Sequence, residues 1–332
     1  MRSSTPKFVG LATVLLLSCA PAAFAQAKVN TVNNNQQNWA ETRATINAQV
    51  SKVTEDVAMT SASIGNSFSA ALGGNSTVNS YQSNTANALA NLNVKASDTV
   101  GSLTMTAAAI GNSASVEIDA LAGGSTSGNS LVNSTQLTGA TTQVIKSDLN
   151  VDASNISGVK APGSDSVTAI SATSAAIANS LSVNVKGDLN ANNFQRFNGD
   201  VRSVLNAKVN DVVGDVTLTS AAIGNSASFE TTDSKTVNIN NTQFMSYDPT
   251  ALTNLQMGKV TGDVNSTTAA IANSLSVSTL PATASLNVNT TQMNGAYTEA
   301  TANIHLGDVT GSVSATAAAI GNSVSINNLP KL

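Results

Sequence analysis

The chain has 332 residues and a net charge of −4, and only 10% of its residues are charged and 3% aromatic. Its basic residues form no cluster, which argues against a nucleic-acid partner. Its single histidine, His305, excludes metal sites that need a second histidine. Other repeats carry Lys or Gln at the position of His305, so this is a variable outward position, which argues against a catalytic triad. The low charge and the many Val, Ile and Thr residues also argue against disorder.

Residues 1–25 have the pattern of a cleaved export signal, with two basic residues, an apolar core and a small-residue cleavage site ending at Ala25. A competing pattern ends at Cys19 and resembles a lipobox, which would make this cysteine the lipidated first residue. We favour cleavage after Ala25. The exported chain then has no cysteine, so its stability in an oxidising compartment does not depend on disulfides.

After a lead of residues 26–32, two short phrases alternate six times along the chain, and together they define six repeats. The first phrase is Asn-x-x-Gln and the second is close to AAIGNS. The recurring amide residues are Asn33, Gln36, Asn66, Asn79, Gln82, Asn112, Asn133, Gln136, Asn179, Asn192, Gln195, Asn225, Asn240, Gln243, Asn273, Asn289, Gln292 and Asn322. The repeats are residues 33–78, 79–132, 133–191, 192–239, 240–288 and 289–329, followed by a tail of 330–332.

The spacing inside the repeats is regular. The Gln lies 30 residues before the Asn of the second phrase in all units except the third, where the separation is 43. We assign the extra residues to a surface insertion within 150–163. A further Asn follows the Gln by 11 residues in the same five units, at Asn47, Asn93, Asn206, Asn254 and Asn303. Valine and glycine turn patterns come next, as in 212–216, so each unit is predicted to be strand, turn, strand, turn, strand.

The fold predicted from these units is an all-β solenoid, or β-helix. The stretch 215–221 alternates apolar and polar residues as a strand does, and the short Ala runs cannot nucleate a helix. The repeat spacing allows a propeller blade, a pair of coils or one wide coil, but the scarcity of aromatic residues argues against a propeller. One coil of about 48 residues would have a perimeter near ~160 Å, hard to fill with Ala and Val. We therefore predict two coils of about 24 residues per repeat.

Stacked coils place equivalent amides over one another, where they can hydrogen bond as ladders. In the second phrase we expect Ile to point inward, Gly or Ala to form a corner, and Asn to cap the turn or join a ladder. The alternative is that each Asn contacts a ligand such as a sugar hydroxyl. A residue that recurs once per repeat favours the structural role.

Catalysis is not expected, and no cofactor or metal is implied. A glycoside hydrolase needs two acids at a defined separation. Asp215 and Asp263 recur at one turn, but Ser occupies this position in sister units. The only local acid cluster belongs to the insertion and is expected to be solvated, and the aromatic residues do not align into a sugar-stacking platform. These residues are Asp148, Asp152 and Asp165 for the acids, and Trp39, Tyr81, Tyr247 and Tyr297 for the aromatics.

The amide phrases, the Ala and Gly richness and the sequence NTVNNNQQN after the signal resemble curlin-type bacterial fibre subunits. The AIGNS repeats more particularly resemble secreted surface proteins of the holdfast-anchoring group in alphaproteobacteria. The resemblance implies an exported structural protein of a Gram-negative cell surface, delivered through an outer-membrane secretion pore. It would join a fibre or anchor an adhesive polysaccharide, with further copies of itself, related fibre subunits or surface polysaccharide as partners. The alternative is a carbohydrate-binding or polysaccharide-cleaving β-helix.

Overall fold

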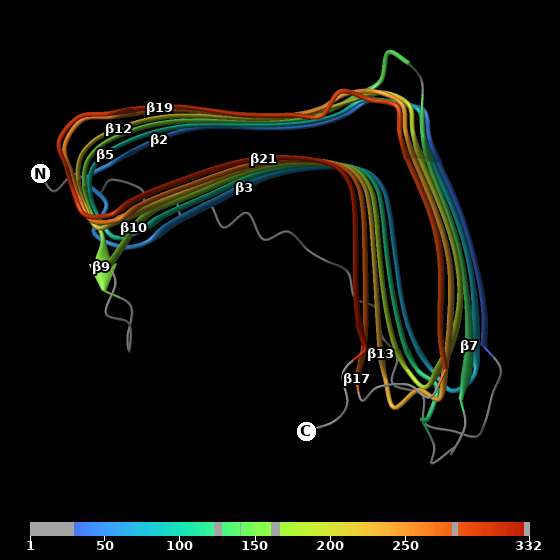
Figure 1. Ribbon diagram of the computed structural model, residues 1–332. Helices are drawn as coiled ribbons and strands as arrows, with labels where there is room; N and C mark the ends of the chain where they lie inside the picture. Colours follow the sequence, from blue (N-terminus) through green and yellow to red (C-terminus); the bar gives the residue numbers. More distant parts are fainter. Residues whose placement is uncertain (1–29, 123–127, 140, 161–166, 281–284, 329–332) are drawn as a thin grey trace, which may run out of the picture.

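A computed structural model describes residues 30–122, 128–139, 141–160, 167–280 and 285–328. Within these ranges the chain is built from parallel strands that stack along one axis (Figure 1), which confirms the all-β solenoid. The predicted export signal, Asp165 and the tail 330–332 lie outside the described residues. No helix in the described ranges is long and apolar enough to cross a membrane.

Each turn of the chain supplies one strand to each of three sheets, which we call sheets A, B and C. Sheet A contains β1 (Asn30–Asn38), β4 (Ser76–Asn84), β7 (Asn129–Thr138), β11 (Asp188–Phe197), β14 (Thr236–Met245) and β18 (Ser285–Asn294). Sheet B contains β2 (Thr42–Ser51), β5 (Ala88–Val100), β8 (Val144–Ser157), β12 (Asp200–Val213), β15 (Pro249–Met257) and β19 (Glu299–Leu306), with the short β16 (Val260–Thr261) and β20 (Val309–Thr310). Sheet C contains β3 (Val57–Gly73), β6 (Leu103–Asp119), β10 (Val167–Lys186), β13 (Asp215–Thr232), β17 (Val264–Leu280) and β21 (Val313–Asn328), with the short β9 (Val159–Lys160) antiparallel to β10.

Each repeat forms a single wide coil, so the prediction of two coils per repeat is wrong. Asn33 of β1 pairs with Asn79 of β4, one whole repeat further along the chain. A single coil of this perimeter can be filled with small side chains because its cross-section is not open. Figure 1 shows instead that the coil is flattened into two layers and bent into two arms. Sheet C lines the inner side of both arms, sheet B covers it in one arm and sheet A in the other, so small side chains need to fill only a thin layer.

The apolar core follows the two arms. Leu92 of sheet B and Met105 of sheet C are buried in the cluster between sheets B and C. Val132 of sheet A and Phe229 of sheet C are buried in the cluster between sheets A and C. Alanines fill the region where the arms meet, packed around Phe197. Small side chains suit this corner because the backbones of two sheets approach closely there.

Most of the extra residues of the third repeat lie at the end of the predicted range and beyond it. Residues 150–157 are part of β8 and pair in register with β12. Equivalent residues of the second and third coils are 57 residues apart in sheet B and 67 apart in sheet C, so ten extra residues follow β8. Asp148 and Asp152 therefore sit on a regular strand and not in an insertion, because the coil keeps its pairing up to Ser157.

The predicted turns before sheet C are present. Gly214 and Gly262 have φ of 120° and 148°, a region open to glycine. Beside them, the backbone N–H of Asp263 donates to Oδ1 of Asp215 at 2.9 Å, one coil earlier. The acid that recurs at this turn thus contacts the next coil's backbone.

Candidate functional site

The AIGNS phrase lies at the bend of sheet C. In β6, Ala109 is buried, Ile110 lies on the opposite face, and Gly111 and Asn112 are both buried. The strand pairing skips this Gly position in both partner strands of every pair, so the register is kept on either side of it. At this unpaired position the strand turns from one arm into the other. The prediction that Ile points inward is wrong, because the inward positions here belong to the Ala before it and to the Gly and Asn after it.

The small residue of the phrase is required by backbone proximity. A Cβ placed on Gly111 would lie 2.6 Å from the carbonyl oxygen of Ala178, in the next coil. A Cβ on Gly224 would lie 2.6 Å from the carbonyl oxygen of Ala272 and 2.5 Å from Sδ of Met245. The third and fifth coils carry Ala at this position, and each has glycine-bearing coils as neighbours. Two adjacent coils therefore never both carry a methyl group at this position.

The asparagines of the phrase form a ladder that runs through all six coils and is buried in the first five, whereas Asn322 of the last coil is exposed. The Nδ2 of each Asn except Asn322 donates to Oδ1 of the Asn in the following coil, at 2.8 to 2.9 Å, and to a carbonyl of sheet A at 2.9 to 3.1 Å. Asn322 donates to the sheet A carbonyl of Gln292 at 3.5 Å. The ladder bonds join Asn66, Asn112, Asn179, Asn225, Asn273 and Asn322, and the sheet A acceptors are Ser83, Leu137, Arg196, Phe244 and Met293.

The glutamines form a second inner ladder of opposite direction. Each Nε2 after the first donates to Oε1 of the Gln in the preceding coil at 2.7 to 2.9 Å, and every Gln also donates to the carbonyl of the serine in AIGNS at 2.7 to 3.0 Å. The members are Gln36, Gln82, Gln136, Gln195, Gln243 and Gln292. Sheet A thus donates to sheet C and sheet C donates to sheet A. The two phrases brace the corner reciprocally, which satisfies the buried polar groups.

Two further ladders lie on outer faces. The first-phrase asparagines Asn33, Asn79, Asn133, Asn192 and Asn240 bond in sequence along sheet A at 2.8 to 3.0 Å, and Asn289 pairs in register with Asn240. On sheet B, the bonded column is Asn47, Asn93, Asn150, Asn206, Asn254 and Asn303, at 2.7 to 2.9 Å. Sequence reasoning missed Asn150, because three extra residues between β7 and β8 move it out of the regular spacing.

A groove of about 1180 Å³ crosses the coils on the outer face of sheet B. The outer Asn ladder forms one wall, and a column with Lys95, Asp152 and Lys208 forms the other. His305 lies at the end of this column in the last coil. The groove offers amide groups at every coil and charges of both signs, but no aromatic side chain lines it.

The acids and aromatics that might serve catalysis or sugar stacking do not converge. Among the described residues no group of three His, Cys, Asp or Glu could hold a metal ion. Asp148 forms an ion pair with Lys146 at 2.7 Å. Tyr81 lies on sheet A, whereas Trp39 and the other tyrosines lie in turns between sheets A and B, in different coils.

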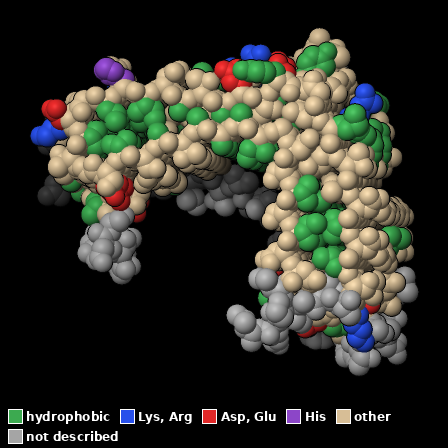
Figure 2. Space-filling model, in the orientation of Figure 1, with side chains coloured by type: hydrophobic (Ala, Val, Ile, Leu, Met, Phe, Trp, Pro, Cys, Tyr) green, Lys and Arg blue, Asp and Glu red, His purple; other side chains and the backbone are tan. Residues whose placement is uncertain are grey.

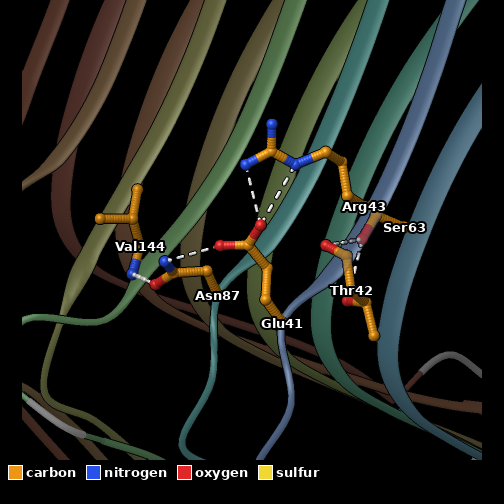
Figure 3. A network of polar contacts seen from close by, with 6 residues as sticks. All are labelled: Glu41, Thr42, Arg43, Ser63, Asn87 and Val144. Atoms are coloured by element: carbon orange, nitrogen blue, oxygen red, sulfur yellow. Dashed lines mark hydrogen bonds and ion pairs between the residues drawn. The ribbon is translucent and has the colours of Figure 1, made fainter.

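Two carboxylates of the first coil are stabilised in their charged form. Arg43 Nη2 donates to Glu41 at 2.8 Å and Asn87 donates to it at 3.2 Å (Figure 3), and these bonds lower the pKa of Glu41 below its ordinary value of 4.5. The backbone N–H and the hydroxyl of Ser102 donate to Asp56 and lower its pKa below its ordinary value of 3.8.

The lowered pKa values of Glu41 and Asp56 predict that acid loosens the first coil. A depressed folded-state pKa adds stability that is present above the unfolded pKa and is lost as the pH falls through the folded pKa. We expect urea unfolding followed by Trp39 fluorescence to shift to lower urea between pH 5.5 and about pH 3. In the variant Glu41→Gln/Asp56→Asn the shift should be smaller. An equal shift in both proteins would contradict the assignment.

Comparison with known proteins identifies the family of this chain. No curated protein and no solved structure matches the chain. Residues 51–331, which are most of the chain and include five complete coils, match the family model described as holdfast attachment protein D. The chain therefore belongs to the holdfast attachment protein D family.

Proposed function

We propose that this chain is an exported, non-enzymatic structural protein that anchors an adhesive holdfast to the cell envelope. The observation that carries the proposal is the continuous stack itself, because two inner amide ladders and three parallel sheets run unbroken through six coils. Such an array transmits tension through many in-register hydrogen bonds. Membership of a holdfast attachment family supports the same role. We also propose export by a cleaved signal and an outer-membrane secretion pore to the surface of a Gram-negative cell.

The proposal is tested in cells whose gene for this chain has been deleted. We expect such cells to make adhesive but to release it into the medium under flow, and the wild-type gene to restore retention. A gene carrying Asn225→Leu should restore less than one carrying Asn240→Leu, because only Asn225 belongs to a buried ladder. Retention of the adhesive by the deletion strain would refute the anchoring role.

The groove on sheet B favours a second candidate function, which is carbohydrate binding. Its outer Asn ladder presents amides at each coil, a repeat of about 4.8 Å along the axis. Lys95 and Lys208 could contact acidic or hydroxyl groups of a polysaccharide. Replacing both lysines by Gln should weaken retention on immobilised surface polysaccharide several-fold with little change of the urea midpoint. Unchanged retention would remove this candidate and leave the anchoring role untouched.

A further inference from the structure

The two ends of the stack are open sheet edges with exposed core. At the first coil the edge strands are β1, β2 and β3, and at the last coil they are β18, β19 and β21. We call these the N edge and the C edge. In the described part of the chain no strand covers either of them. Uncovered parallel edges offer rows of N–H and C=O groups to another strand.

We propose that the C edge of one copy pairs in register with the N edge of a second copy, which extends the solenoid end to end. This inference rests on the proposed structural function and names its partner. Four independent features of the two edges match in this arrangement. They are the direction of the amide ladders, the charges, the apolar columns and the exposed aromatics.

The amide ladders end with complementary groups. In the Gln column each amide donates to the preceding coil, so Gln36 of the first coil has an N–H left for a preceding copy and Gln292 of the last coil has a free Oε1. The outer Asn column of sheet B has the same direction, from Asn47 to Asn303. The inner Asn column runs the opposite way, and it too meets acceptor with donor when C edge joins N edge. Two N edges, or two C edges, would bring like amide groups together.

Two charged columns end in opposite signs. Strand pairing places Arg43 and Glu299 at the two ends of one column of sheet B. A second column begins at Lys52 and ends at Asp308, in the turns that follow β2 and β19. All four side chains are exposed. In the proposed joint each cation lies beside an anion. If two N edges joined, cations would face cations, and if two C edges joined, anions would face anions.

The apolar columns are also incomplete at both ends. Val57 and Val313 end a column whose inner members Leu103 and Val216 are 0% exposed, and Val313 is 44% exposed. Figure 2 shows apolar side chains gathered between the two layers of each arm on the face toward the viewer. Pairing of the edges would remove this surface from water, and burial of apolar area is the main driving force of association.

Exposed aromatic side chains lie in corresponding turns of the two end coils. Trp39 lies between β1 and β2 and is 76% exposed, and Tyr297 lies between β18 and β19 and is 69% exposed. The joint would make these turns neighbours. Trp39 is the only tryptophan of the chain, so its fluorescence reports on the N edge alone.

The test uses two charge-reversed forms of the purified protein at low ionic strength. Form N carries Arg43→Glu/Lys52→Glu, and form C carries Glu299→Arg/Asp308→Lys. Each form alone has like charges at every joint, and we expect its critical concentration for assembly to rise about tenfold over wild type. In a 1:1 mixture, forms N and C can alternate along the filament, which places opposite charges at every joint, and the mixture should assemble like wild type. Light scattering, Trp39 fluorescence and electron microscopy follow the reaction.

A proline provides a stronger block that spares the coil. Thr42 donates its N–H to Asn87 O on the β5 side, and N–H direction alternates along a parallel strand, so Thr45 directs its N–H to the open edge. Thr45→Pro should reduce assembly at least tenfold with an unchanged urea midpoint, and the control Thr45→Val should assemble normally.

The possible outcomes distinguish a failure of the end-to-end pairing from a failure of the proposed anchoring role. Failure of the mixture to recover, or a wild-type protein that stays monomeric at all concentrations, would overturn end-to-end pairing. Cells carrying form N would then still retain their adhesive if the anchoring role is correct. Loss of self-assembly together with intact retention refutes the joint alone, whereas normal retention in the deletion strain refutes the anchor.

Discussion

Replacing Asn225 by leucine should lower the free energy of unfolding by about 3 to 5 kcal/mol. The side chain is fully buried, accepts from Asn179 at 2.8 Å, and donates to Asn273 at 2.8 Å and to the carbonyl of Phe244 at 2.9 Å. Leucine has a similar volume but leaves all three partner groups without a hydrogen bond, in a place that water cannot reach. Urea denaturation followed by far-UV circular dichroism measures the change.

Asn240→Leu is the matched control for the buried ladder. Asn240 also belongs to an amide ladder, but its side chain is exposed on sheet A and water can replace its bond to Asn192. We expect a change below about 1 kcal/mol. Equal effects of the two substitutions would show that burial does not decide what a ladder contributes.

Replacing Gly224 by valine should destabilise the protein by about 3 kcal/mol, because the corner of the coil has no room for a side chain. The nearest obstacle that cannot rotate away is the carbonyl oxygen of Ala272, 2.6 Å from the added Cβ. Moving it would separate β13 from β17 at the bend. The measurement is again the urea midpoint.

Gly295→Val is the control for this second substitution. A Cβ there would lie 3.8 Å from its nearest neighbour, the carbonyl oxygen of Met245, which is ordinary contact. We expect a change within about 0.5 kcal/mol. If Gly224→Val left the urea midpoint unchanged, the bend would be able to open, and steric crowding would not explain the glycine.

The stability effects should also depend on position along the stack. A solenoid is held by contacts between neighbouring coils, so its stability is close to a sum over coils and interfaces. Asn225 and Gly224 belong to the fourth coil and have neighbours on both sides. The equivalent change Asn66→Leu in the first coil breaks one ladder bond and should cost less.

The sequence by itself determined the strands, their order and the residues that recur in register. Alternating Val and Thr positions, glycine turns and six copies of two amide phrases were sufficient, because a repeat places equivalent side chains in one column whatever the shape of the coil. The spacing of Asn33, Asn79 and their successors is also the pairing distance seen in sheet A.

Only the tertiary structure decided the shape of the coil and the direction of the isoleucines. Local patterns record the alternation of faces but not where a strand bends, and the unpaired position at Gly111 shifts that alternation by one residue. Whether 46 residues close as one flattened coil or two round ones depends on which sheets face each other. That choice is set by packing between residues such as Val132 and Phe229. These residues are distant in the sequence, so local periodicity does not predict that they pack together.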